Sequence, residues 1–319
     1  MELELEPDQD RLPAGKKNID ASGHLVMPGG VDGHCHLDQP TGDGSVCADD
    51  FYTGTVAAAY GGTTTVIPFA CQFRGMPMQA AVDDYHRRVH GKAVIDYAFH
   101  LIVSDPTEAL LKVDLPRLIN EGYTSFKIYM TYDDLKLDDG QMLDVLEVAR
   151  QHGAMAMVHA ENADCIEWLT KRLEAAGRTA PRFHAHARPM LVEREATHRA
   201  LSLAQLVDVS ILIVHVSGRE AVEQIRWARG HGLHPRKGTI AIGSDADLVV
   251  WDEREFALSN AQLHHAVDYT PYEGQRLRAW PGLTLSRGEV VWDGSTFHGR
   301  PGRGQFLACG APSLLPVRN

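Results

Sequence analysis

The stretch Val31-Asp32-Gly33-His34-Cys35-His36-Leu37 follows an apolar run at residues 25–28 and the pair Gly29-Gly30. Side chains alternate between the two faces of an extended strand, so His34 and His36 lie on the same face. Two imidazoles at the end of one strand can bind a single metal ion. On its own the pair leaves a second interpretation open, in which both histidines are ordinary polar residues of a loop.

Short apolar and β-branched runs alternate along the chain with segments of helical periodicity. Runs that are nearly continuous in apolar residues are typical of strands buried on both faces, as in parallel sheets. The clearest helical segment, 138–152, begins with two aspartates, carries an apolar stripe and is followed by Gly153. The predicted strands are 25–31, 63–69, 94–103, 125–130, 154–158 and 210–214, and the other predicted helices are 49–60, 77–90, 106–120, 161–176, 190–206 and 218–230. This repeated strand-then-helix pattern predicts an α/β fold with right-handed crossovers.

Residues able to serve in a metal site lie at or near the carboxyl ends of these strands. They are His34 and His36 at the first strand, Lys127 in the fourth, His159 after the fifth and His215 after the sixth. Barrels of the (β/α)8 type build their active sites at this edge. An open doubly wound sheet would instead place its site in a crevice and would normally carry a glycine-rich phosphate loop. The stretch Tyr60-Gly61-Gly62-Thr63 lacks the spacing of such a loop, so the pattern favours a TIM-type barrel.

The four histidines and the lysine together indicate a hydrolase with two metal ions. Neutral imidazole is a good ligand for zinc and similar ions. A lysine ammonium has no lone pair, but a lysine carbamylated by CO₂ becomes a carboxylate that can bridge two ions. Lys127 lies in an apolar strand, where a bare ammonium is costly to bury. Taken singly, each residue has a plainer interpretation: Lys127 reaching solvent with its head group, and His159 or His215 as hydrogen-bonded core histidines.

Composition excludes several classes of protein. The net charge of −11 and the lack of a basic tract argue against a nucleic-acid-binding protein. No run of about 18 uncharged apolar residues is present, so no membrane span is expected. The acidic N-terminus lacks the pattern of a secretory signal, and the five scattered cysteines suggest a reducing compartment without disulfides. We therefore expect a cytoplasmic protein that binds neither nucleic acid nor a membrane.

Segments spread over most of the chain carry a family resemblance. They are MPGGVDGHCHLDQP, ADDFYTGTVAAAYGGTTTVIPFA, SFKIYMTYDDLKLDDGQML, MVHAENAD, HARPMLVEREAT, ILIVHVSGREAVEQIRWAR, PRKGTIAIGSDADLVVWD, HHAVDYTPYEG and HGRPGRG. Together they resemble the cyclic amidohydrolases, that is, the hydantoinases and dihydropyrimidinases of the metal-dependent amidohydrolase superfamily.

The resemblance implies a role for each candidate residue. It implies that His34 and His36 bind one divalent ion, that His159 and His215 bind a second, and that carbamylated Lys127 bridges the two. It also implies that Tyr132 donates a hydrogen bond to the oxyanion of the reaction. Without the resemblance, Tyr132 could equally be a packing aromatic in a loop.

The activity implied is ring-opening hydrolysis of a small cyclic amide or imide, such as a hydantoin or a dihydropyrimidine. Two divalent ions, zinc or manganese, would lower the pKa of a shared hydroxide and polarise the ring carbonyl. An aspartate would pass the proton to the leaving nitrogen. The resemblance also implies a homo-oligomer, commonly a tetramer. The alternatives are another amidohydrolase, such as an allantoinase or dihydroorotase, and a non-catalytic scaffold of the same fold.

The shuttle aspartate, expected at the end of the eighth barrel strand, is not found. After the sixth strand–helix unit the chain passes through residues 230–238 directly into short strands with Gly and Asp turns. The seventh and eighth units are therefore missing, at least ~60 residues at about 30 per unit. Asp245 and Asp247 are predicted to form a turn entering a strand rather than to replace the missing carboxylate. We accordingly expect a chain that keeps most metal ligands but has little or no hydantoinase turnover.

The predicted architecture is thus a (β/α)8 TIM-type barrel that lacks its last two βα units, with a small β-sandwich domain formed by the chain ends. Residues 1–24 are the remaining N-terminal part of the sandwich, which is shortened relative to the family. Residues 25–234 form the incomplete barrel, and residues 235–319 form the C-terminal part of the sandwich and a tail.

Overall fold

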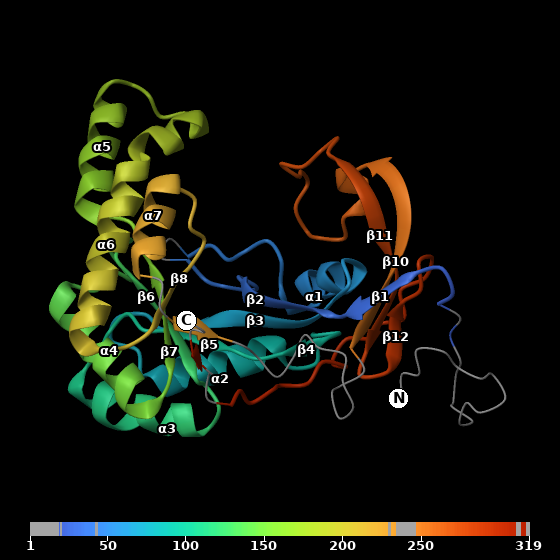
Figure 1. The fold of residues 1–319 in the computed structure, drawn as a ribbon, viewed down its shortest axis with the longest axis horizontal. Coiled ribbons are helices and arrows are strands. Elements are labelled where there is room, and N and C mark those ends of the chain that lie inside the picture. The colour runs from blue at the N-terminus through green and yellow to red at the C-terminus, as the bar shows by residue number, and fades with distance from the viewer. Residues whose placement is uncertain are drawn as a thin grey trace.

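The computed structural model describes residues 19, 21–41, 44–228, 231–233, 247–310 and 314–316. Figure 1 shows two sheets side by side, a parallel sheet flanked by helices and a separate antiparallel sheet built from β1 and β10–β12. The antiparallel sheet takes its strands from both ends of the described chain, since β1 spans Leu25–Pro28 and the other three strands follow residue 247. No helix in the described ranges is long and apolar enough to cross a membrane.

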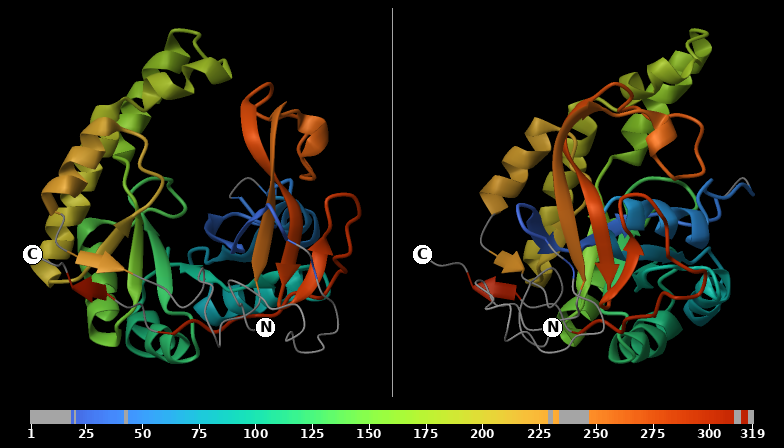
Figure 2. Two further views of the ribbon diagram at one scale, coloured as in Figure 1. Left: turned by 45° about the vertical axis from the view of Figure 1, so that its right-hand side comes forward. Right: turned by 90° about the vertical axis from the view of Figure 1, so that its right-hand side faces the viewer.

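The parallel sheet follows the chain in order. Its strands are β2 (Gly30–Cys35), β3 (Thr63–Cys71), β5 (His100–Ile102), β6 (Ser125–Tyr129), β7 (Met155–His159) and β8 (Ile211–Ile213), with β4 (Asp96–Tyr97) paired beside β3. All neighbouring strands are parallel. A strand order that never reverses is that of a barrel wall rather than of a doubly wound sheet. Figure 2 shows the sheet curling only part of the way round, and no pairing among the described strands joins β8 back to β2. The predicted incomplete barrel is confirmed.

Helices follow the strands as the sequence predicts. They are α1 (Phe51–Tyr60), α2 (Met78–Val89), α3 (Leu115–Asn120), α4 (Asp139–His152), α5 (Ala163–Ala175), α6 (Met190–Val207) and α7 (Arg219–Ala228), with the short turns η2 (Leu110–Asp114) and η3 (Pro181–Ala187). The side chain of Asp138 caps α4 in a capping box with Gln141, and Gly153 ends it in the left-handed conformation. The predicted helix 106–120 is split into η2 and α3, because Pro116 has no N–H for a regular helical hydrogen bond.

The predicted strand 25–31 is wrong as a single element. Residues Leu25–Pro28 form β1, which pairs antiparallel with β10, whereas β2 begins at Gly30 and pairs with β3. The chain crosses between the sheets at Gly29, whose N–H donates to the Asp247 carbonyl at 2.7 Å. A side chain at Gly29 would collide with Thr64. Apolar content alone could not reveal this crossing, because both halves of the run are sheet strands.

The second sheet has the order β1, β10 (Leu248–Ala257), β11 (Arg276–Ser286) and β12 (Glu289–Trp292), followed in the chain by a tail. The described residues contribute one antiparallel layer of the predicted sandwich. A short turn, η4 (Asn260–Gln262), follows β10, and β9 (His231–Leu233) pairs separately with β13 (Leu314–Pro316). Asp247 directly precedes β10, as expected of a residue entering a strand, and its carboxylate accepts from the Arg287 N–H at 2.7 Å. Asp245, residues 1–18 and most of the junction 230–238 lie outside the described residues.

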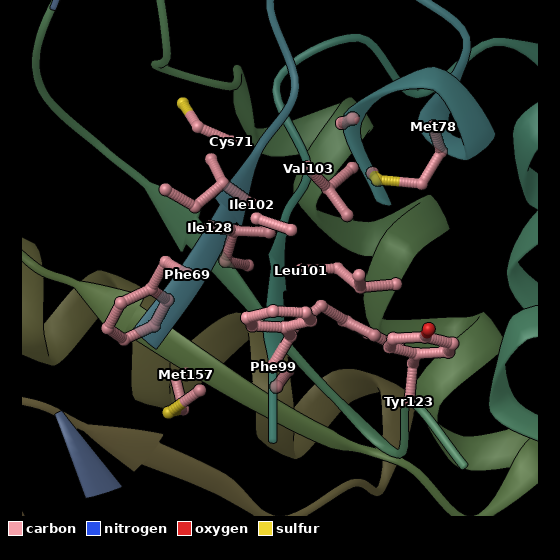
Figure 3. Close-up of a cluster of buried hydrophobic side chains, with 14 of the residues drawn as sticks. Phe69, Cys71, Met78, Phe99, Leu101, Ile102, Val103, Tyr123, Ile128 and Met157 are labelled. Atoms are coloured by element: carbon pink, nitrogen blue, oxygen red, sulfur yellow. The ribbon is translucent and has the colours of Figure 1, made fainter. Parts of the chain in front are cut away.

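The main core lies between the parallel sheet and its helices. Figure 3 shows Phe99 and Leu101 beside Tyr123, apart from Phe69 and Met157. The tail contributes to this core, since Phe306 packs its ring 5.7 Å from that of Phe99. Backbone hydrogen bonds join the tail to the barrel along residues 304–309, at Ala93, Tyr97 and Gly122. The tail therefore fastens the antiparallel sheet to the barrel wall.

Replacing Leu101 by Ala should destabilise the protein by about 2–5 kcal/mol, because Leu101 is fully buried and the change leaves a cavity. Leu206→Ala is the matched control, since Leu206 is 75% exposed and its change should stay within about 0.5 kcal/mol. Urea unfolding of both variants measures the difference. Equal effects would contradict the assigned core.

Candidate metal centre

The structure brings the candidate side chains from distant strands to one edge of the parallel sheet. His34 lies in β2, His36 directly follows it, Lys127 lies in β6, His159 ends β7 and His215 follows β8 by two residues. The centre of the His34 ring is 5.5 Å from that of His36 and 5.4 Å from that of His215, which is 4.4 Å from that of His159. Lys127 Nζ lies 3.3 Å from His34 Nε2. Residues up to 181 positions apart in the sequence thus form one cluster.

Lys127 is the buried centre of this cluster. Its side chain is 0% exposed, and Nζ lies 5.0 Å from the ring centres of Phe69 and of Tyr129. Among the described residues no carboxylate lies within ion-pair distance of Nζ, and burial lowers the pKa of Lys127 to about 7. A substantial fraction of the amine is therefore neutral near neutral pH, which is the form that reacts with CO₂.

The histidines are held neutral as well. Burial, followed by the neighbouring Lys127, lowers the pKa of His34 to about 3. Burial, together with His159 and Lys127, lowers the pKa of His215 to about 4. Burial also lowers the pKa of His36, although a hydrogen bond to Gln39 opposes the shift. Neutral imidazoles retain the lone pair that a metal ion requires.

Hydrogen bonds fix which nitrogen of two rings is available. His36 Nδ1 lies 2.5 Å from Gln39 Oε1, which can only accept, so Nδ1 carries the hydrogen and Nε2 keeps its lone pair. His159 Nε2 donates to Glu161 Oε2 at 2.8 Å, which leaves Nδ1 as the basic nitrogen. Metal-bound histidines commonly donate their other nitrogen to such acceptors. The donor set therefore fits divalent ions of the zinc type.

The cluster is not arranged as a finished binding site. Within the described ranges, no three His, Cys, Asp or Glu side chains are placed to hold one ion as they stand. The rings are nonetheless about as close as imidazoles that share one ion through bonds of about 2.0–2.1 Å.

Tyr132 lies at the mouth of the cluster. Its ring centre is 5.3 Å from that of His159, and its side chain is 45% exposed. Tyr132 has a φ of 68° and His215 a φ of 36°, both in the left-handed region that non-glycine residues rarely adopt. Both strained residues belong to the cluster or border it, and strained backbone of this kind is concentrated at active sites of proteins.

Sequence reasoning missed several side chains that surround the candidates. They are Phe69, which stacks on His36 and lies against His34, Tyr129, which stacks on His159, and the hydrogen-bonding residues Gln39, Glu161 and His100. Gln39 and Glu161 follow ligand candidates by three and two residues, so their nearness in the chain was an available signal. Strand alternation could also have placed Tyr129 on the face of Lys127.

Comparison with known proteins identifies the same family that the sequence motifs resemble. Residues 25–206 match the model of the amidohydrolase family. A D-hydantoinase of Geobacillus stearothermophilus is 34% identical over an alignment that spans 92% of this chain and 88% of that protein. A crystal structure of D-hydantoinase superposes with a TM-score of 0.88 at 33% identity, covering 92% of this chain and 90% of the other. The dihydropyrimidinase of Brevibacillus agri superposes with a TM-score of 0.88 at 30% identity and the same coverage.

The alignment also supports the internal deletion. It extends over 418 positions, whereas this chain has only 319 residues. The matched part of the Geobacillus protein therefore contains long stretches without a counterpart here. Loss of strand–helix units from the barrel accounts for such a gap.

The lowered pKa of Lys127 predicts a pH dependence for metal-free protein in CO₂-depleted buffer. The unfolded chain binds a proton on this lysine up to about pH 10.5, whereas the folded chain loses it above about pH 7. The free energy of unfolding should therefore rise with pH above about 7. Burial raises the pKa values of Cys35 and Cys71 to about 12, which opposes the rise near pH 9 and above. Denaturant unfolding between pH 7 and 8.5 should show a steeper rise for the wild type than for Lys127→Met, and equal slopes would contradict the assignment.

Proposed function

Because the chain belongs to the amidohydrolase family, we propose that its clustered histidines and Lys127 form the metal centre of a cyclic amidohydrolase that opens hydantoin or dihydropyrimidine rings. The single observation that carries this proposal is the convergence of four imidazoles on a fully buried lysine without a carboxylate partner among the described residues. A buried amine in a ring of neutral donors is unfavourable unless chemistry changes it. Carbamylation removes the positive charge and supplies ligand oxygens.

The proposed centre holds two divalent ions, zinc or manganese. His34 and His36 would hold one ion, His159 and His215 would hold the other, and carbamylated Lys127 would supply oxygens to both. Bound ions of this kind supply Lewis acidity, which lowers the pKa of water and polarises an amide carbonyl. The surrounding residues orient the donors: Gln39 holds His36, and Glu161 holds His159.

Tyr132 is proposed to stabilise the oxyanion. Its place beside His159 and its exposure at the mouth suit a hydroxyl that meets the substrate. A hydroxyl aimed at developing negative charge accelerates amide hydrolysis, because it binds the transition state more tightly than the ground state.

The proposed site lacks an unengaged carboxylate, among the described residues, to carry the proton to the leaving nitrogen. The two carboxylates that the structure places against the cluster are already engaged: Asp32 accepts from the His34 N–H, and Glu161 accepts from His159 and Arg188. Burial alone would raise the pKa of Glu161, but hydrogen bonds from His159 and Arg188 outweigh it and lower that pKa. A carboxylate with a lowered pKa is a poor proton carrier at neutral pH, so the site is proposed to bind metal but to turn over slowly.

Other features of the proposal come from the family resemblance of the sequence and from its composition. The protein is proposed to act in the cytoplasm on a small cyclic amide and to assemble as a homotetramer. A non-catalytic scaffold of the same fold is the second candidate, favoured by the open sheet and the missing proton carrier. Metal content separates the two, since a scaffold has no need of ions.

Purified protein loaded with zinc in bicarbonate buffer should contain about two ions per chain, because four imidazoles and the bridging carbamate of Lys127 suit a pair of ions. Lys127→Met removes the bridge and should lower the content to one ion or fewer. Elemental analysis of desalted protein measures both. A wild type without bound ions would favour the scaffold.

Turnover of hydantoin and dihydrouracil should depend on metal and be slow. Loss of a general acid–base group commonly costs 10²–10⁴-fold, so kcat should be roughly 10²–10⁴-fold below that of the Geobacillus D-hydantoinase assayed in parallel. Ring opening is followed by the fall in ultraviolet absorbance, with chelator-treated protein as the control. Turnover equal to that of the relative would refute the impaired step.

A further inference from the structure

His100 is a buried histidine that the proposed reaction does not use. It begins β5 and is 8% exposed. Its neighbours Phe99 and Leu101 lie beside Tyr123 on one side of the sheet, as Figure 3 shows, so alternation directs His100 to the opposite face. There its ring centre lies 5.0 Å from that of Phe69, which also contacts His34 and His36.

Both nitrogens of His100 have partners. Nε2 lies 3.0 Å from the Gly33 carbonyl oxygen and Nδ1 lies 2.6 Å from Ser125 Oγ. A carbonyl oxygen can only accept, so Nε2 carries the hydrogen and Nδ1 accepts from the Ser125 hydroxyl. The two bonds together select one neutral tautomer and one ring orientation.

The Gly33 carbonyl belongs to the peptide group that leads into His34. Pairing of β2 with β3 is irregular here, with a register shift between Asp32 and Cys35. The His34 N–H of the same peptide donates to Asp32 Oδ1 at 3.0 Å, and the carbonyl accepts from His100. Side chains, rather than the strand ladder, therefore fix the plane of this peptide. Irregular strand positions of this kind commonly aim a functional side chain.

The second partner leads to Lys127. Ser125 and Lys127 are two residues apart in β6 and share a face of the sheet. From its place in β5, His100 therefore bonds to the neighbouring strand β6, which carries Lys127, and across β3 to β2, which carries His34. The side chains of His34 and Lys127 meet between these two strands, with His34 Nε2 and Lys127 Nζ 3.3 Å apart.

We propose that His100 is a positioning residue of the metal centre: by binding the Gly33 carbonyl and the Ser125 hydroxyl, it sets the aim of His34 toward Lys127. The inference rests on the proposed function for its consequence in metal binding, but its geometric part concerns this chain alone. Residues behind the ligands of a metal commonly change its affinity 10–100-fold when replaced.

The variants separate the two bonds of His100. His100→Phe keeps a ring but leaves both partners without a donor or acceptor, and its zinc affinity should fall roughly 10–100-fold. His100→Gln retains an N–H that reaches Gly33 and should recover most of that loss. His86→Phe is the matched control, because His86 is a partly buried histidine bonded to the Tyr123 hydroxyl at 2.7 Å, in a different part of the core.

Competition with a chromophoric chelator measures zinc affinity, and the visible spectrum of Co²⁺-loaded protein reports the ligand geometry. The proposal expects weaker binding and an altered spectrum in His100→Phe, recovery in His100→Gln and neither change in His86→Phe. Unchanged affinity in His100→Phe, or equal weakening in both phenylalanine variants, would overturn it.

If the wild type binds no metal, the proposed function is wrong but the positioning role of His100 can still be tested. The test is then a crystal structure of metal-free His100→Phe. The distance between His34 Nε2 and Lys127 Nζ should increase from 3.3 Å when the Gly33 carbonyl loses its donor. An unchanged distance between His34 Nε2 and Lys127 Nζ would show that the strands orient His34 without help from His100.

Discussion

Burial of Lys127 is the constraint on which the site depends. An ammonium at the centre of a parallel sheet loses its hydration, and the described residues offer it aromatic faces and imidazoles instead of a carboxylate. The protein resolves this unfavourable placement by lowering the pKa of the amine to about 7. The same burial keeps His34 and His215 neutral. One physical cause, burial, thus lowers the pKa of the lysine and of both histidines and favours their neutral forms.

The sequence predicts the parts of this structure that follow from local periodicity. Apolar runs mark the strands, the capping signals mark α4, and histidines at strand ends mark the cluster. The change of sheet at Gly29 is not predictable in this way, because it depends on which distant strand pairs with each half of the run. The same holds for the left-handed backbone of Tyr132 and for the bonds of His100, which join residues 25 and 67 positions away.

The incomplete barrel leaves its sheet with two edge strands among the described residues. A closed barrel has no edge strands, whereas the described sheet ends at β2 and β8. The tail contacts other parts of the barrel: it hydrogen-bonds to Ala93, Tyr97 and Gly122 and inserts Phe306 among the core aromatics, and none of these residues lies in β2 or β8. The site remains assembled because the strands that carry the candidate ligands belong to the part of the barrel that is kept.

Metal binding and proton transfer are therefore separable in this fold. The first needs only donors from β2, β6, β7 and the segment after β8, all of which are present and in contact. The second needs a carboxylate whose pKa lies near neutrality and whose oxygens are not already bonded. Asp32 and Glu161 are both engaged with the backbone or side chains of candidate ligands, so freeing either one would loosen the histidine that it holds. Under the proposed function, a chain that lacks the last barrel units would therefore keep metal binding more readily than turnover.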